Sequence, residues 1–358
     1  MRIVVIGGGL AGSSAALALH KAGFDVGVHE AHPHAGDDIG AFLTLAANGA
    51  RALRQIDVVA EAGFALTGLR LTDSTGSELA KSTLDDGFRC LRRSELCAQL
   101  QAELRRRSIP IEFGARLTGV EQDGTGVLAR FADGRTAEGD LLLGADGLHS
   151  AVRGLIDPVP ERYAGQRVFY GYSDHVPPHE PGRIEMIRGS GTAFGYAVEP
   201  EGRTYWFARL PAPPLDGEPG PALRERLLAA LRSDATPAAE IVASTEDVLA
   251  TDARDVATPP PWRSGRIALI GDAAHAASPA TGQGASMAFE DAVVLAKALR
   301  DHGSTEVYER LRRPRAENNI VRSADLTASD YAERPEVVER LRRDESGAEP
   351  EPQWHRPV

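Results

Sequence analysis

The chain begins Met1-Arg-Ile-Val-Val-Ile-Gly-Gly-Gly-Leu-Ala-Gly12, and this stretch decides the fold. Its four apolar residues, Ile3 to Ile6, predict a short strand that is buried on both faces, as in a parallel sheet. Glycines at the spacing G-x-G-x-x-G follow, and residues 13–22, rich in Ala and Leu, predict a helix. A second strand over residues 25–29 ends at Glu30, which is placed to bond the ribose hydroxyls of an adenosine.

Each glycine of this motif meets a separate physical need. Gly7 permits the tight turn, Gly9 lets the backbone approach a pyrophosphate, and Gly12 lets the helix and the strand pack closely. The helix start, with Leu10 and Ala11, presents unpaired N–H groups and a positive dipole end to the phosphates. The strand, glycine turn, helix, second strand and acid together predict a dinucleotide site. They do not identify the dinucleotide or its chemistry.

Composition is that of a soluble globular protein, with 42% hydrophobic and 25% charged residues among 358. The net charge of −11 argues against a nucleic-acid partner or an anionic membrane surface. The apolar N-terminus is not expected to be a secretion signal, since its glycines fall at the dinucleotide spacing, and no segment approaches transmembrane length. Cys90 and Cys97 are interpreted as reduced thiols of a cytoplasmic protein, and no metal site is expected. Any redox chemistry must therefore come from a cofactor.

After Glu30 the chain alternates helices with short strands. A strong helix is predicted over residues 94–107, with Ser94 as its N-cap and Glu95 in the first turn. Further helices are predicted over residues 47–60, 222–233, 285–300 and 306–323, and strands over 68–79, 89–91, 109–113, 117–122, 126–131, 136–143 and 266–270. The final stretch, residues 330–358, is charged and contains Pro, so we expect it to be loosely ordered.

Aromatic residues concentrate between Tyr163 and Leu210, separated by Gly and Pro, and predict an antiparallel sheet in an inserted domain. The return to a short apolar strand at residue 266 indicates one dinucleotide fold interrupted by this substrate domain. The predicted division is residues 1–72, 93–162 and 263–300 for the cofactor domain, 73–92 and 163–262 for the substrate domain, and 301–358 for C-terminal helices and tail.

Two later stretches also end predicted strands. Gly144-Ala-Asp-Gly-Leu-His-Ser150, with Arg153 beyond it, is either a ligand-binding loop or a simple turn. In the second, Gly271-Asp272, the acid can accept hydrogen bonds from sugar-like hydroxyls. A Pro/Gly loop over residues 279–284 then leads into a helix whose N–H groups can stabilise an anion.

Together these motifs resemble the class A flavoprotein monooxygenases, the para-hydroxybenzoate hydroxylase family. The resemblance spans residues 1 to about 325 and rests on three motifs in order: the glycine turn with Glu30, Asp146-Gly147, and Gly271-Asp272 with Pro279-x-x-Gly282-Gln283-Gly284. It implies an α/β fold: a Rossmann-like FAD-binding domain of the GR2 type, interrupted by a substrate domain with an antiparallel sheet and followed by C-terminal helices. The chain resembles the compact members, which lack a thioredoxin-like extension.

The resemblance also implies roles for individual residues. Gly7, Gly9 and Gly12, with Leu10 and Ala11, would hold the FAD pyrophosphate, Glu30 the adenosine ribose, and Asp272 the ribityl and phosphate portion. The isoalloxazine would be lined by Pro279, Gly282, Gln283, Gly284 and Ala285. Arg93 would contact the phosphate or ribose region, and Asp146 and Arg153 would serve both FAD and NAD(P)H.

Two departures from the family pattern stand out. Ser286 replaces the more usual Asn after Gly-Gln-Gly, which puts a side-chain contact to the ring in doubt. No Arg lies between Glu30 and Arg51, where some members have another cofactor-facing arginine. Arg93 is therefore the more important candidate for an arginine contact to the cofactor.

The implied chemistry is hydroxylation by FAD. NAD(P)H is the transient reductant, O₂ the co-substrate and a flavin C4a-hydroperoxide the oxygen donor. The implied substrate is an aromatic or polyketide-like small molecule, and the flavin rather than a side chain carries the reaction. The expected protein is a monomer or a homodimer.

Candidate residues for the substrate pocket come from the aromatic stretch: Tyr170, Tyr172, Tyr196, Trp206 and Arg209, with Pro279. Strand alternation puts Trp206 on the opposite face from Tyr205 and Arg209, and any one of these aromatics can equally be core. His275 is interpreted as a structural residue. The pair Glu290-Asp291 is interpreted as ordinary polar residues of a helix.

Three alternative functions are considered. A flavin-dependent halogenase should carry a W-x-W-x-I-P segment, which this sequence lacks. An NAD-dependent dehydrogenase would leave residues 271–284 unexplained. A non-catalytic FAD-binding protein stays open, because no side chain here is an indispensable nucleophile.

Overall fold

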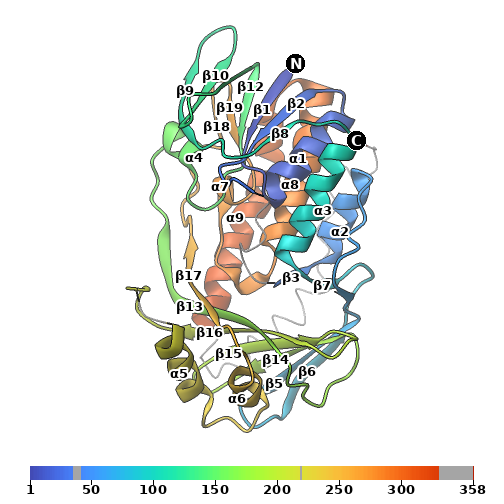
Figure 1. Ribbon diagram of the computed structural model, residues 1–358, viewed down its shortest axis with the longest axis vertical. Helices are drawn as coiled ribbons and strands as arrows, with labels where there is room; N and C mark the ends of the chain where they lie inside the picture. Colours follow the sequence, from blue (N-terminus) through green and yellow to red (C-terminus); the bar gives the residue numbers. More distant parts are fainter. Residues whose placement is uncertain (35–41, 218–219, 330–357) are drawn as a thin grey trace.

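The structure is a computed structural model that describes residues 1–34, 42–217, 220–329 and 358. The predicted tail beyond residue 329 lies almost wholly outside the described residues. Two sheets at opposite ends of the molecule dominate the fold, and long strands and a helix connect them (Figure 1).

The first sheet has six strands in the order β18-β19-β12-β1-β2-β8. Their bounds are Arg263–Ser264 (β18), Ile267–Leu269 (β19), Leu141–Gly144 (β12), Arg2–Ile6 (β1), Asp25–His29 (β2) and Ile111–Glu112 (β8). All neighbours run parallel except β18, which pairs antiparallel with β19. The apolar run of β1 is buried on both faces, as its sequence predicts.

Register brings the three sequence motifs to one edge of this sheet. Ile6 of β1 lies beside Gly144 of β12, and Gly144 lies beside Leu269 of β19. The glycine turn, the Ala145-Asp146 loop and the Gly271-Asp272 loop therefore leave the sheet side by side. Carboxyl ends of parallel strands are where doubly wound folds bind ligands.

Helices pack against this sheet and against one another. They are α1 (Leu10–Lys21), α2 (Ala47–Gln55), α3 (Arg93–Arg106), α4 (Ala151–Ile156), α7 (Asp272–His275), α8 (Gly284–His302) and α9 (Thr305–Ser329), with a short 3-10 turn η1 (Pro279–Thr281). Helix α8 packs on both α1 and α2, and α9 packs on α8. The predicted N-cap Ser94 is wrong: strand β7 (Arg89–Arg92) runs directly into α3, so Arg92 is the N-cap and Ser94 lies in the first turn.

The second sheet has seven strands in the order β17-β13-β16-β15-β14-β5-β6. Their bounds are Leu249–Asp255 (β17), Arg162–Ser173 (β13), Thr204–Pro211 (β16), Ala193–Val198 (β15), Arg183–Arg188 (β14), Gly68–Asp73 (β5) and Glu78–Thr83 (β6). The predicted antiparallel sheet is confirmed with one exception, because β5 pairs parallel with β14. The β5–β14 pair joins two distant parts of the chain, so no local sequence pattern predicts this parallel pairing. The finer division into domains stays a prediction.

Two small three-stranded sheets complete the fold. One contains β9 (Leu117–Gln122), β10 (Val127–Phe131) and β11 (Thr136–Gly139); the other contains β3 (Phe42–Leu45), β7 (Arg89–Arg92) and β4 (Phe64–Ala65). Helices α5 (Gly220–Leu231) and α6 (Ala238–Ala243) cover one face of the seven-stranded sheet, while residues of β3, β4 and β7 pack on its other face. Among the described residues, no helix is both long and apolar enough to cross a membrane.

Candidate active site

The glycine turn after β1 is shaped by backbone packing. Gly7 has a φ of +102°, and a Cβ there would lie 2.5 Å from the carbonyl oxygen of Ala145. A Cβ on Gly12 would lie 1.9 Å from the carbonyl oxygen of Gly7. At Gly9, by contrast, no described atom lies within 4 Å of a Cβ position, so this backbone is open to a ligand. Gly9 is also the N-cap of α1, and it supplies no side-chain cap to the helix N–H groups beginning at Leu10.

Glu30 lies against this turn. Its Oε2 accepts a hydrogen bond from the Gly8 N–H at 2.6 Å, and its Oε1 accepts one from the His32 N–H at 2.8 Å. The Gly8 carbonyl in turn accepts from the buried Gln101 amide at 2.9 Å, a contact that sequence reasoning missed. Gln101 is in an ordinary helix position and has no motif around it, so nothing in the sequence singles it out.

Arg93 also belongs to this neighbourhood. It is the first residue of α3, one turn before Cys97, whose thiol contacts the Gly8 carbonyl at 3.7 Å. Burial raises the pKa of Cys97, the charge of Arg93 opposes the rise and that of Glu30 adds to it. Arg93 and Glu30 therefore act electrostatically on the same thiol beside the glycine turn.

Asp146 and Arg153 bind protein groups in their own loop. The Asp146 carboxylate accepts from the Ser150 hydroxyl at 2.5 Å and from the Val152 N–H at 3.1 Å. Burial raises the pKa of Asp146, while these hydrogen bonds oppose the rise. The Arg153 guanidinium donates to the carbonyls of Leu148 and Ala273, at 2.6 and 3.3 Å. Asp146 thus fastens the Asp-Gly loop to the start of α4, and Arg153 connects the loop to α7. A contact of either side chain with a dinucleotide stays a prediction.

The Gly271-Asp272 loop meets the glycine turn directly. Gly271 has a φ of +61°, and a Cβ there would lie 2.9 Å from the Ala11 Cβ in the first turn of α1. Asp272 follows as the exposed first residue of α7. A Cβ on Gly284 would lie 3.9 Å from Asp272 Oδ1, so the loop that precedes α8 adjoins this carboxylate.

That loop presents backbone rather than bulky side chains. Pro279 begins the turn η1, Gly282 closes it with a φ of +65°, and α8 begins at Gly284. Pro279, Gly282 and Gly284 are exposed, and Ala285 is half-buried. The loop therefore places a left-handed glycine and a helix start beside Asp272.

A buried ionic cluster lies beneath these loops. Asp291 accepts from Arg312 Nε at 2.6 Å and from the Gly271 N–H at 3.2 Å, and its Oδ2 lies 2.5 Å from His275 Nε2. Burial alone would raise the pKa of Asp291, but His275 and Arg312 outweigh it and lower the pKa to about 2. The interpretation of Glu290-Asp291 as ordinary helix residues is wrong, because α9 supplies arginines that draw both carboxylates into the interior.

Glu290 extends this cluster to α2. Its carboxylate lies 2.7 Å from Arg312 and accepts two hydrogen bonds from Arg315, at 2.8 and 3.1 Å. It also accepts from Asn48 Nδ2 at 2.8 Å, and the same Nδ2 donates to Gln283 Oε1 at 3.1 Å. Asn48 and Glu290 were not among the predicted site residues, because their contacts join parts of the chain more than 200 positions apart.

The departure at Ser286 has a packing explanation. Ser286 is fully buried where α8 crosses α2, and a Cβ on Gly49 would lie 2.5 Å from its Oγ. The hydroxyl accepts a hydrogen bond from the Ala46 N–H at 3.3 Å. An Asn side chain would not fit this crossing without moving α2, so Ser286 here serves the helix contact.

The aromatic candidates divide between the two faces of the seven-stranded sheet. Tyr170, Tyr172 and Arg209 share the face that packs against Phe42 of β3. Tyr196 and Trp206 lie on the other face, in the core beneath α5 and α6. The alternation of β15 and β16 turns both side chains away from Phe42 and buries them in this core, and their assignment to the substrate pocket stays a prediction.

Trp206 illustrates the packed face. It is fully buried, stacks on Phe194 with ring centroids 5.6 Å apart, and donates from Nε1 to Thr245 Oγ1 at 2.8 Å. On the Phe42 face, the guanidinium of Arg209 lies 5.7 Å from the Phe207 ring centroid. Burial raises the pKa of Tyr170 to about 12, and the charge of Arg209 opposes that rise.

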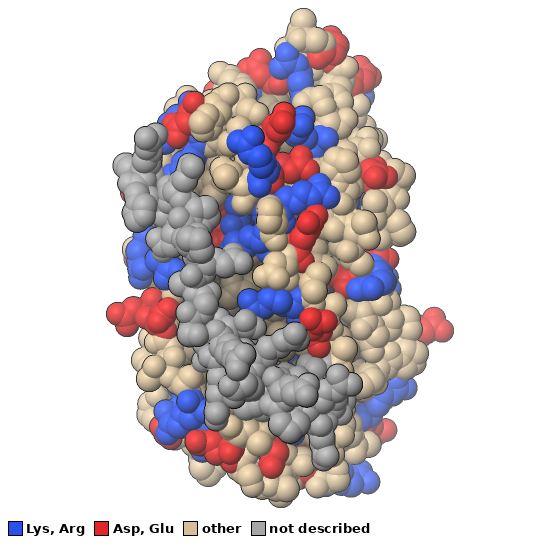
Figure 2. Space-filling view, turned by 180° about the vertical axis from the view of Figure 1, so that it is seen from behind, with Lys and Arg blue, Asp and Glu red and all other residues tan. Residues whose placement is uncertain are grey.

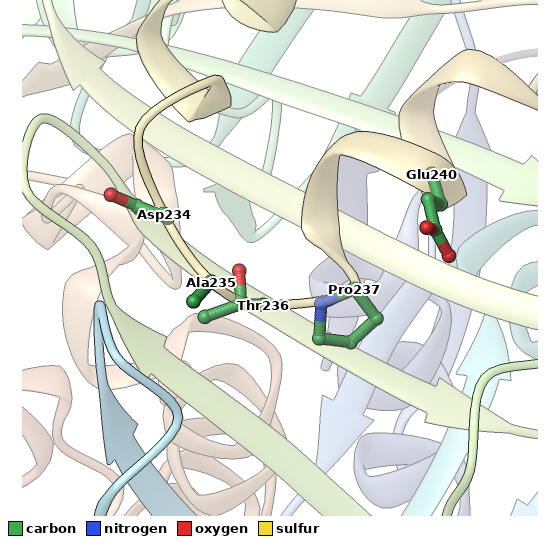
Figure 3. Close-up of a pocket in the computed structure, with 5 residues that line it drawn as sticks. All are labelled: Asp234, Ala235, Thr236, Pro237 and Glu240. Carbon is green, nitrogen blue, oxygen red and sulfur yellow. The ribbon is translucent and has the colours of Figure 1, made fainter.

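A surface depression elsewhere on the protein is a weaker candidate for the active site. It is lined by Asp234, Ala235, Thr236, Pro237 and Glu240, at the connection between α5 and α6 (Figure 3). All five residues come from one short stretch, and the Asp234 carboxylate is already bonded to Ser190. Within the described ranges, no group of three or more His, Cys, Asp or Glu residues is arranged to hold a metal ion.

The arrangement at the sheet edge fits an adenine dinucleotide that carries a flavin. The backbone at Gly9 is open where a pyrophosphate would approach, and Glu30 lies beside this glycine turn. Asp272 and the Gly282–Gly284 loop lie along the same edge of the sheet. A family model described as an FAD binding domain matches residues 1–323. The chain belongs to the class A FAD-dependent aromatic monooxygenases.

Individual relatives agree with this family. The chain is 33% identical over 316 residues to an aurachin C monooxygenase/isomerase of Stigmatella aurantiaca, covering 84% of this chain and 80% of that protein. It is 30% identical over 367 residues to an FAD-dependent urate hydroxylase of Mycolicibacterium vanbaalenii, covering 95% and 91%.

Solved structures agree as well. The Klebsiella pneumoniae protein HpxO, complexed with FAD and uric acid, superimposes with a TM-score of 0.84 at 28% identity, covering 96% of this chain and 92% of that one. The protein is an FAD-dependent monooxygenase, and NAD(P)H and O₂ are the typical co-substrates of its family.

Proposed function

We propose that this monooxygenase hydroxylates a planar aromatic or polyketide-like small molecule that binds against the Phe42 face of the seven-stranded sheet. The observation that carries the proposal is the convergence of three motifs at one sheet edge, together with an aromatic sheet face that carries a buried arginine. Bound FAD supplies the oxygen-transfer chemistry, so the protein contributes position, exclusion of water and electrostatics.

Local geometry supports the proposed cofactor-binding roles. The open backbone at Gly9 and the uncapped start of α1 receive the pyrophosphate. Glu30 and Arg93 would hold the ribose and phosphate end, and Asp272 would hold the ribityl portion. Pro279, Gly282, Gly284 and the start of α8 would line the isoalloxazine.

On the substrate side, Tyr170 and Tyr172 offer flat apolar surface, and Arg209 adds a positive charge. Arg92 adds a second charge at the rim, with its guanidinium 4.7 Å from the Tyr172 ring centroid. A planar ring with an acidic hydroxyl or carboxyl group is complementary to this combination, since apolar faces stack and the acid pairs with arginine.

The first test is FAD binding. The purified protein should be yellow or should bind added FAD, and Asp272→Ala should weaken that binding in a fluorescence titration. Glu121→Gln, an exposed ion-pair variant on β9, serves as the matched carboxylate control. A colourless protein that ignores FAD would overturn the assignment.

The second test is turnover. NAD(P)H oxidation should accelerate with the right aromatic substrate, with O₂ uptake and a product heavier by one oxygen in mass spectrometry. The panel should contain phenols, aromatic acids and polyketides, each with both nicotinamides. FAD binding without turnover across that panel would favour a non-catalytic FAD-binding protein, and a halogenated product would favour the halogenase alternative.

The setting of the reaction is also part of this proposal. We place the protein in the cytoplasm as a monomer or a homodimer, supported by its two free thiols and its ordinary globular composition. Acidic and basic side chains intermingle over the face in Figure 2, which supports a small-molecule substrate rather than nucleic acid. Size-exclusion chromatography with light scattering distinguishes monomer from dimer.

A further inference from the structure

Gln283 lies between the two exposed glycines of the loop that precedes α8, and its side chain is held from the protein side. An amide such as Gln283 can present either its oxygen or its NH₂ group to a ligand, and the two choices have opposite polarity. Which end faces outward therefore matters for any ring that binds along this loop. The proposal below rests on the proposed location of FAD.

The polarity is set by Glu290. An ionised carboxylate only accepts hydrogen bonds, and Glu290 is surrounded by the donors of Arg312 and Arg315. Burial alone would raise the pKa of Glu290, but these two arginines outweigh burial and hold the pKa below its ordinary value. Glu290 thus stays a pure acceptor toward its remaining neighbour, Asn48.

Asn48 transmits this polarity to the loop. Because Glu290 accepts only, Asn48 must turn its Nδ2 group toward the carboxylate, at 2.8 Å. The second hydrogen of the same Nδ2 points to Gln283 at 3.1 Å, so Gln283 must present its oxygen to Asn48. The Gln283 NH₂ group is then the end left over, and within the described ranges it has no protein partner.

We propose that Glu290 and Asn48 act as positioning residues that fix the Gln283 amide with its N–H donors directed at the edge of the isoalloxazine ring. A donor at this edge favours the negative charge that the ring system gains on reduction, because a fixed dipole is already aligned with it. We call this chain of hydrogen bonds, from Glu290 through Asn48 to Gln283, the relay. The relay thus raises the midpoint potential of bound FAD. It requires no change in the substrate site.

The test is a mutant cycle read by the midpoint potential of bound FAD, measured by dye-coupled reduction without substrate. Gln283→Leu should lower the potential and weaken FAD binding by roughly two- to tenfold, the range for one neutral hydrogen bond. Asn48→Leu should lower the potential in the same direction, since Gln283 is then free to rotate. The double variant should match Gln283→Leu alone.

A second variant tests polarity without touching the α2–α8 contact. Gln283→Glu keeps an oxygen for Asn48 but replaces the donor by an acceptor, so it should lower the potential further than Gln283→Leu does. Asn319→Leu is the matched control: its amide oxygen accepts from Thr281 in the same loop at 2.9 Å but does not contact Gln283. This control should leave the potential at the wild-type value.

The outcomes separate cleanly. An unchanged potential in Asn48→Leu, additive shifts in the double variant, or a higher potential in Gln283→Glu would each overturn the relay. Should Asn48→Leu fail to fold, the Gln283→Glu comparison still decides, since that residue is partly exposed. The measurement needs FAD but no substrate, so a protein that hydroxylates nothing in the panel would still give a clear answer.

Discussion

Gly9 and Gly12 belong to one sequence motif, yet the structure gives them different reasons to be glycine. At Gly12 a Cβ would collide with the Gly7 carbonyl, 1.9 Å away, whereas at Gly9 the same atom would meet nothing that the structure describes within 4 Å. The motif spacing predicts both positions from sequence. The structure adds that the protein's own packing requires Gly12, whereas the open position of Gly9 is explained only by the proposed pyrophosphate site.

This difference predicts two distinct alanine phenotypes. Gly12→Ala should destabilise the protein by at least the roughly 1–3 kcal/mol typical of overpacking, since backbone must move. Gly9→Ala should leave the apo protein nearly as stable, because its φ of −72° suits alanine, yet weaken FAD binding by roughly tenfold or more. Thermal unfolding of the apo proteins and FAD titration distinguish the two. Equal loss of stability in both variants would contradict the assignment.

At the scale of elements, α8 connects the loop over residues 279–284, the proposed cofactor loop, to the protein interior. Its sequence predicts a helix, and the helix is present, but the roles of Glu290 and Asp291 depend on partners from α2, α7 and α9. Such contacts leave no local signal, since an acidic pair in a helix is usually solvated. The cofactor loop was therefore predictable from sequence, while the ionic cluster that supports it was not.

The cluster predicts acid sensitivity. Folding lowers the pKa of Asp291 from 3.8 to about 2. Its contribution, about 2 kcal/mol, is therefore fully present above about pH 5 and is lost progressively as the pH falls toward 2. Asp291→Asn should remove this dependence. At neutral pH it should cost about 3–5 kcal/mol, because His275 and Arg312 lose a buried partner. Urea unfolding at pH 7 and pH 3 measures both effects, with Glu121→Gln as a control expected to cost less than about 1 kcal/mol.

Strand β16 predicts a second contrast, between its two faces. Trp206→Ala should cost about 3–5 kcal/mol of stability, since a fully buried side chain leaves a cavity under α5 and α6. Arg209→Met should instead raise the KM for an acidic aromatic substrate and have a smaller effect on unfolding. Steady-state kinetics beside thermal unfolding test this contrast. A KM change in Trp206→Ala at a temperature where it is fully folded would return that residue to the substrate site.

At the scale of the whole molecule, the proposed FAD site contains residues from the beginning, middle and end of the described chain. Fold class and the interrupted cofactor domain were predictable, because the glycine and acid motifs repeat at strand ends. Alternation within β16 also predicted that its aromatics divide between two faces. The parallel β5–β14 pair was not predictable, nor was which face α5 and α6 cover, because each depends on elements distant in sequence.

A cofactor shared by such distant segments should stabilise them together. FAD at a hundredfold excess over its Kd should raise the free energy of unfolding by about 2.7 kcal/mol. Calorimetry should show the transition moving to higher temperature with FAD concentration, and Asp272→Ala should reduce the shift. A transition that stays in place at saturating FAD would contradict binding to the native state at this edge.

The order of strands β12, β19 and β1 has a consequence for biosynthesis. β1 leaves the ribosome long before β19, which begins only at Ile267 and completes the parallel sheet beside β12. Helix α8, which packs on α1, follows β19. Until then the nascent sheet exposes an unpaired edge and the apolar side of α1. We expect folding to be largely post-translational, with a long interval in which chaperones must shield this edge from aggregation.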